Sequence, residues 1–176
     1  MRSIRRFTLT CGFLAVVATM GCGSNASETV GDVPDPERAP TVKARRLPKA
    51  VLPDGLSVTL ELAISNDEIA QGLMYRSSLA SDRGMLFLLR HERAPSFWMK
   101  NTLIPLDIVF LDQRGVVVDV THDARPCKAD PCPKYVSKSP ATAVLELPSG
   151  TAKTHGLEEG ARIEFADVPD YPKEEG

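Results

Sequence analysis

The 176-residue sequence lacks several features that would place it in a common functional class. It has no excess of positive charge, since 21 Lys and Arg residues stand against 23 Asp and Glu residues, which disfavours a broad basic surface for nucleic acid. It contains no Gly-x-Ser-x-Gly nucleophile motif, no His-Glu-x-x-His motif and no phosphate-binding glycine loop. It also has no repeat, no low-complexity array and no internal apolar run long enough to span a bilayer.

The first 21 residues have the pattern of an export signal. A basic start with three arginines precedes an uncharged, mostly apolar run, Phe7–Met20, which is too short to span a bilayer comfortably. Gly21 and Cys22 follow, and this pair resembles the cleavage site of bacterial lipoprotein signals. We therefore expect residues 1–21 to be a signal peptide and Cys22 to carry lipid. Cleavage at another small residue stays open, because Thr19 stands where such sites usually have leucine.

A lipid on Cys22 predicts a protein of the bacterial cell envelope, anchored to a membrane and facing the periplasm or the exterior. Its mature chain has 155 residues, enough for one domain with a real core, and a net charge of −5, because three of the 21 basic residues and none of the 23 acidic ones leave with the signal. Residues 22–48, rich in polar residues and proline, are expected to form a disordered tether. Residues 49–168 are then a single β-rich domain, and residues 169–176 a flexible tail.

The four cysteines divide between these segments. Cys11 leaves with the signal and Cys22 carries the lipid, so Cys127 and Cys132 remain to form a disulfide in an oxidising compartment. A metal-binding or redox role for that pair stays open, although two thiols in an exported loop usually form a local disulfide. The three histidines lack regular ligand spacing, and neither a metal site nor a cofactor is expected.

Hydrophobic patterning predicts a mainly β domain with one or two short helices. Leu56–Ile64 alternates as a half-buried strand does, and Ser65 with Glu68 predicts a capping box that opens a short helix. The apolar runs Gly84–Leu89 and Leu106–Leu111 predict strands buried on both faces. Further elements are a hairpin partner after the turn at 112–115, two more strands and a helical turn: Val116–Val120, Thr142–Leu147, Arg162–Val168 and Ala152–His155.

Several runs of residues also resemble one known family. In chain order they are Gly72–Arg76, Gly84–Phe87, Phe97–Thr102, Pro105–Ile108, and Val144–Leu147 followed by Gly150. From about Leu56 to Phe165 the sequence is similar to the Domain of Unknown Function 192 family. The resemblance implies a compact, mostly antiparallel β sandwich or barrel with short helices, often exported and sometimes lipidated. It implies no activity, catalytic residue or cofactor, so function must be argued from the site.

The segment Ser96–Asp107 gathers the chemistry of a binding site. Trp98, the only tryptophan, offers a large flat surface, and ammonium, amide and hydroxyl groups follow it on Lys100, Asn101 and Thr102. These four residues are therefore candidates for contact with a polar ligand, a sugar or a peptide. The structural alternative is that Trp98 and its neighbour fill the core while the amide and hydroxyl groups bond a turn.

Two carboxylates stand within apolar strands, Asp107 and Glu146, and a buried charge requires a partner. Arg76 and Lys100 are available, so we expect a partly buried cluster of these four residues beside Trp98. The cluster is either a ligand pocket or a set of ion pairs that fixes strand register. Asp107 and Glu146 are also candidate acid and base groups of a glycan-directed hydrolase, if their carboxyl groups lie about 5 to 10 Å apart in an open cleft.

These features favour a noncatalytic binding or accessory module of the cell envelope. Its partner would be an envelope glycan, a small molecule or another protein, and nucleic acid is not expected. The alternatives are the hydrolase and a purely structural spacer.

Overall fold

The computed structural model describes residues 46–172. The expected signal peptide, the lipidated Cys22, nearly all of the tether and residues 173–176 lie outside the described residues. Within the described range, neither helix has the length and apolar character needed to cross a membrane.

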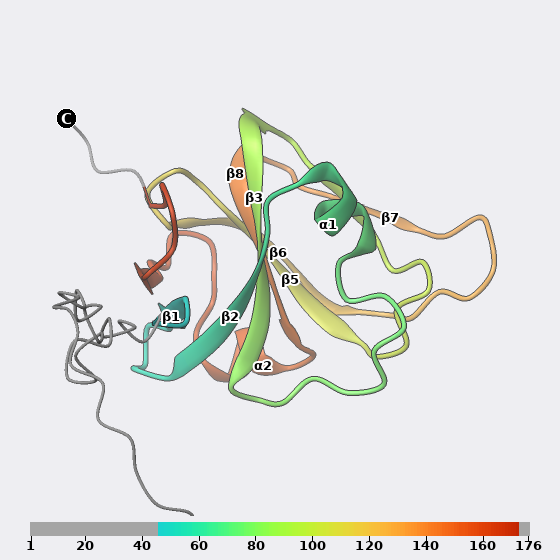
Figure 1. Ribbon diagram of the computed structural model, residues 1–176, viewed down its shortest axis with the longest axis horizontal. Coiled ribbons are helices and arrows are strands. Elements are labelled where there is room, and N and C mark those ends of the chain that lie inside the picture. The colour runs from blue at the N-terminus through green and yellow to red at the C-terminus, as the bar shows by residue number, and fades with distance from the viewer. Residues whose placement is uncertain (1–45, 173–176) are drawn as a thin grey trace, which may run out of the picture. The chain divides into compact units, whose positions relative to one another are not determined.

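The sheet confirms the expected mainly β class. Seven strands form one curled half-barrel in the order β6-β5-β8-β3-β2-β1-β9, and β4 pairs with β7 in a second small sheet (Figure 1). Neighbouring strands run antiparallel except β2 and β3, which are parallel. The strands are β1 (Lys49–Val51), β2 (Ser57–Ala63), β3 (Arg83–Arg93), β4 (Ser96–Trp98), β5 (Leu106–Leu111), β6 (Val117–Ala124), β7 (Lys134–Val136), β8 (Ala141–Pro148) and β9 (Glu164–Ala166).

The two short helices, α1 (Asn66–Gln71) and α2 (Thr151–Thr154), lie close to the predicted positions. The capping box of α1 is confirmed, because the Ser65 backbone N–H donates to Glu68 Oε2 at 2.8 Å and the Glu68 N–H donates to Ser65 Oγ at 3.2 Å. The helix ends at Gln71, since Gly72 adopts a φ of 46° that a helix does not allow. A side chain at Gly72 would also press on the Phe87 ring, which lies 3.2 Å from the position of a Cβ atom.

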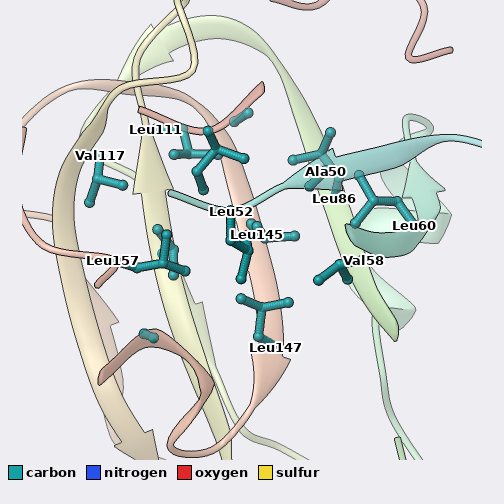
Figure 2. Close-up of a cluster of buried hydrophobic side chains, with 14 of the residues drawn as sticks. Ala50, Leu52, Val58, Leu60, Leu86, Leu111, Val117, Leu145, Leu147 and Leu157 are labelled. Carbon is teal, nitrogen blue, oxygen red and sulfur yellow. The ribbon is translucent and has the colours of Figure 1, made fainter. Parts of the chain in front are cut away.

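Each central strand has an apolar layer on both of its faces, because successive side chains point to opposite sides. One layer, the barrel core, fills the curl of the sheet, and Figure 2 shows its leucines from several strands converging. The other layer, the outer cluster, lies beneath α1 and the β4–β7 pair, and its members include Leu73, Phe87, Met99 and Phe110. In Figure 1, α1 and β7 lie on one side of β3 and β8, and β1 lies on the other.

The two ends of the sheet are joined across the barrel core. The Val117 N–H donates to the carbonyl of Ala161 at 2.8 Å, and the Ile163 N–H donates to the carbonyl of Gly115 at 2.9 Å. Tyr171 covers the same end, with its ring edge-on to Phe165 and its hydroxyl donating to the Asp112 carbonyl at 2.7 Å. Tyr171 is only 7% exposed, so this residue is packed against the domain, whereas the sequence predicted a flexible tail from 169.

Candidate functional site

A small hollow of about 20 Å³ opens over the outer cluster. One wall is the end of α1 and the turn after it, residues 69–74, and the other walls are the side chains of Phe87, Phe97, Trp98, Thr102 and Glu146. Three of the residues predicted to bind a ligand, Trp98, Thr102 and Glu146, therefore meet at one place, although Glu146 is distant in sequence from the other two. The volume is enough for about one water molecule or one group of similar size.

Glu146 is the unusual member of this hollow. It lies on β8 between Met85 of β3 and Ile108 of β5, and its side chain is on the face of the outer cluster. The residue is 5% exposed, and within residues 46–172 its carboxyl group makes no hydrogen bond or ion pair. Burial raises the pKa of Glu146 to about 8. At neutral pH the carboxyl group is therefore mostly protonated, and it can both donate and accept a hydrogen bond.

Trp98 forms the exposed edge of the hollow. Phe97 packs inward with its ring edge-on to Phe87 at 5.0 Å, so the next side chain along β4 points outward, and Trp98 is 45% exposed. Lys100 Nζ lies 5.3 Å from the centre of the indole ring and forms an ion pair with Asp130 Oδ2 at 2.7 Å. The indole is thus fixed by a cation while part of its surface stays open to a ligand.

The loop after β4 holds Asn101 and Thr102 in place. Asn101 has a φ of 58°, and Tyr75, in the turn after α1, has a φ of 63°, a left-handed conformation that asparagine adopts more readily than most residues and that is rare for tyrosine. The two residues bond each other, because the Tyr75 N–H donates to the Asn101 carbonyl at 2.8 Å and Asn101 Nδ2 donates to Tyr75 Oη at 2.9 Å. Thr102 is 5% exposed and its hydroxyl has no hydrogen bond within the described part of the chain.

Tyr75 is a residue that the sequence analysis missed. Its side chain is 69% exposed, and its contact with Asn101 adds a second open aromatic ring to the same loop system. The sequence did contain one signal for Tyr75, because it lies in Gly72–Arg76, one of the runs of residues that resemble the family. Exposed aromatic rings beside a recess are common where proteins bind sugars, peptides or cations.

The predicted disulfide between Cys127 and Cys132 is present and supports Lys100. The Cys127 N–H donates to the Met99 carbonyl at 3.0 Å, and the Asn101 N–H donates to the Cys127 carbonyl at 2.9 Å. The loop that the disulfide closes carries Asp130, the ion-pair partner of Lys100. The bridge therefore holds the loop against the segment that carries the indole.

Replacing both Cys127 and Cys132 by serine is expected to lower the free energy of unfolding by about 2 kcal/mol, since the closed loop is short. The emission of Trp98, the only tryptophan, should also shift, because Asp130 no longer holds Lys100 near the ring. Urea denaturation followed by tryptophan fluorescence measures both effects. Unchanged emission from the folded double variant would show that the loop does not position the cation.

Arg76 does not join the hollow. Its guanidinium group forms a two-point ion pair with Glu61 on β2, in which Nη2 donates to Glu61 Oε2 at 2.6 Å. This pairing raises the pKa of Arg76 and lowers the pKa of Glu61, in each case mainly through the hydrogen bond between them. The pair lies beside the turn after α1, so Arg76 helps to fix that turn.

Asp107 is on the opposite face of the sheet from Glu146, and the four-residue cluster is not assembled. Asp107 pairs in register with Leu147, so it shares the barrel-core face with that leucine, whereas Ile108 pairs with Glu146. Both carboxylate oxygens of Asp107 accept backbone N–H groups, from Asp123 at 2.9 Å and Ala152 at 2.8 Å. With the sheet between them, Asp107 and Glu146 do not face a common cleft, so the acid–base pair of the hydrolase alternative has no geometric support.

A larger cavity of about 580 Å³ lies elsewhere, where β3 arches away from β8. Leu88 and Arg93, five residues apart, pair with Ala143 and Ala141, only two residues apart, and the arch between them lines the cavity. The Thr142 hydroxyl is buried there without a hydrogen bond. None of the predicted site residues lines this cavity, and its charged residues are exposed and of both signs.

Within residues 46–172 no three His, Cys, Asp or Glu side chains come together in an arrangement that could hold a metal ion. The polar groups of the hollow are instead one carboxyl group, one hydroxyl group and the amide of Gln71, surrounded by aromatic rings. This chemistry suits noncovalent contact with a small polar group.

The fold and hollow together define a small β half-barrel with a recessed site on the outer face of its sheet. The chain belongs to the DUF192 family, described as Uncharacterized ACR, whose profile matches residues 50–165. No curated protein matches the sequence. The expected family membership is thereby confirmed, and the family brings no established activity with it.

Two solved structures are similar to this chain. A candidate transcription regulator from Sinorhizobium meliloti is 36% identical with a TM-score of 0.61, and the match covers 69% of this chain and 93% of that one. A protein of unknown function from Novosphingobium aromaticivorans is 33% identical with a TM-score of 0.61, and the match covers 67% of this chain and 83% of that one.

Proposed function

We propose that this protein is a lipid-anchored component of the bacterial cell envelope whose β domain binds a ligand without catalysing a reaction. The observation that carries the proposal is the Glu146 carboxyl group, which belongs to a residue only 5% exposed, has no hydrogen bond within residues 46–172 and lines a hollow beside an open indole ring. A polar group that is largely removed from water and has no partner is costly, and a ligand group that bonds it would offset that cost. The anchor itself rests on the sequence pattern at Gly21-Cys22.

A binding role is favoured over catalysis because the hollow contains one ionisable side chain. General acid–base hydrolysis needs a second group facing the same substrate, and Asp107, the other candidate, bonds backbone groups on the far face of the sheet. Neither Arg76 nor Lys100 forms an ion pair with Glu146, since each is paired with another carboxylate. The site is therefore equipped to recognise a group rather than to transform it.

The hollow is so small that only part of a ligand can enter it, and the rest must lie on the surface around it. A recess of about 20 Å³ takes only one terminal group. The remainder would lie across exposed side chains in and after β4 and in the turn after α1, where Trp98, Leu103 and Tyr75 are 45%, 43% and 69% exposed. An envelope glycan or a peptide segment of an envelope protein has this combination of a projecting group and an extended body.

Replacing Trp98 by alanine is expected to weaken ligand binding at least about tenfold without unfolding the protein, because half-exposed aromatic anchors dominate such sites. The full-length chain would be titrated with soluble cell-wall fragments, oligosaccharides and envelope peptides by calorimetry. Ile64→Ala is a matched control, since Ile64 is also 45% exposed but lines the larger cavity. Absence of saturable binding across the panel, or binding that the Trp98 variant retains in full, would contradict the proposal and leave a structural spacer.

A further inference from the structure

The hollow is lined by aromatic and aliphatic side chains and by three polar ones, among them the amide of Gln71, and by no basic side chain. Its lining contains the Glu146 carboxyl group, the Thr102 hydroxyl group and the rings of Phe87, Phe97 and Trp98. Arg76 and Lys100, two residues after Met74 and Trp98 in the chain, are each neutralised by a carboxylate outside the hollow. An anionic ligand group would meet no positive charge there, so carboxylates and phosphates are disfavoured.

From this lining we infer that the group recognised in the hollow is a primary ammonium, carried on an alkyl chain. An ammonium has three donors, and the hollow offers carboxyl and hydroxyl oxygens to accept them. Three aromatic rings line this recess, and a ring attracts a cation that meets its negatively charged face. The volume of about 20 Å³ accepts an ammonium head and excludes a trimethylammonium.

Binding of the cation involves a proton on Glu146. In the empty protein the carboxyl group is kept neutral by burial and has no counter-charge. When an ammonium enters, its positive charge stabilises the carboxylate, so the Glu146 proton leaves to solvent and an ion pair remains in the hollow. In this step a protonated carboxyl group and an ammonium group give a carboxylate–ammonium ion pair and one proton. No other ionisable group lines the hollow, so the released proton is assigned to Glu146.

This inference deepens the proposed binding function and names the chemistry of the projecting ligand group. A primary ammonium occurs on a lysine side chain and on an amino sugar. The chain length between the ammonium and the bulk of the ligand separates the two sources, because a narrow recess is reached more easily by a four-carbon arm than by a group fixed to a sugar ring.

The test is calorimetric titration of the full-length protein near neutral pH with n-butylammonium, n-butanol and butyrate, three probes that differ in the head group. Butylammonium should bind saturably and at least about tenfold more tightly than the other two. Repeating the titration in two buffers of different ionisation enthalpy should show release of about one proton. Nα-acetyl-lysine amide and glucosamine then distinguish the peptide and sugar sources, and the lysine compound is expected to bind more tightly.

Glu146→Gln should abolish the preference for butylammonium and the proton release, whereas Glu158→Gln, which removes a charge from an exposed turn, should change neither. Equal binding of butylammonium and butanol, or butylammonium binding that the Glu146 variant retains, would overturn the ammonium assignment. If neutral oligosaccharides bind through Trp98 while amines do not, the assignment fails and the proposed binding function stands. If no probe and no envelope fragment binds, both fail.

Discussion

The Glu146→Gln variant is expected to be more stable than the natural protein at pH 8, by about 4 kcal/mol. Glutamine keeps the shape of the side chain and remains neutral at every pH. The natural residue has a pKa near 4.5 in the unfolded chain and of about 8 in the folded protein, so the folded state holds its proton more tightly. Ionisation of the unfolded chain therefore destabilises the natural fold as pH rises.

The sign of the effect defines a pH window. Below the unfolded pKa of 4.5 both states are protonated, and the variant has no advantage. Between that value and about 8 the unfolded chain loses its proton while the fold retains it, so the stability of the natural protein falls relative to the variant. Above about 8 both states are ionised and the difference stays constant.

Urea denaturation of both proteins at about pH 4 and pH 8 measures this difference. The Glu158→Gln variant is the control, and its stability should follow that of the natural protein. A Glu146→Gln variant that is less stable than the natural protein at both pH values would show that the carboxyl group has a structural partner. A gain in stability combined with a loss of ligand binding is instead the behaviour of a group retained for function.

Asp107→Ala is expected to have the opposite effect, a loss of about 3 kcal/mol or more in the free energy of unfolding. Asp107 is fully buried, and its two oxygens accept the backbone N–H groups of Asp123 and Ala152. Truncation leaves the buried Ala152 N–H and the part-buried Asp123 N–H without this acceptor, and a hydrogen bond to a charged acceptor contributes about 1.5 to 3 kcal/mol. For a domain of this size the melting temperature should fall by about 10 °C.

Differential scanning calorimetry of Asp107→Ala, with Asp82→Asn as an exposed control, tests this role. Asp107→Asn should also be destabilised, because its amide can accept only through its single oxygen and places an NH₂ group against a backbone donor. A melting temperature within about 2 °C of the natural protein for both Asp107 variants would contradict the assignment of Asp107 to the scaffold. Replacing Glu146 is thus expected to raise the free energy of unfolding at pH 8, and replacing Asp107 is expected to lower it.

Most of the main elements could be predicted from the sequence because their signals are local. The capping box at Ser65, the apolar run Leu106–Leu111 and the turn that follows it all correspond to structure seen here. The three-residue strands β1, β4 and β7 were missed. Strands of that length have too few residues for a period to show, and they exist because a distant partner pairs with them.

The candidate site was predicted only in part, since strand register is a property of the fold. The sequence placed Asp107 and Glu146 in apolar strands, but whether they share a face depends on how β5 pairs with β8, and a shift of one residue would reverse the answer. Trp98, Thr102 and Glu146 do meet at the hollow. The mutual bonding of Tyr75 and Asn101 depends on left-handed backbone conformations at both residues, and although asparagine is enriched in that region, tyrosine is not.

The pairing of β1 with β9 places the entry and the exit of the domain side by side, with Lys49 opposite Ala166. A fold whose ends adjoin can be grafted into a surface loop of a host protein, or have its native ends linked and new ones opened at an exposed turn. The hollow is built from α1 and the turn after it, from β3, β4 and β8 and from Thr102, and none of these includes those ends. The half-barrel can therefore be inserted into another protein with its hollow intact.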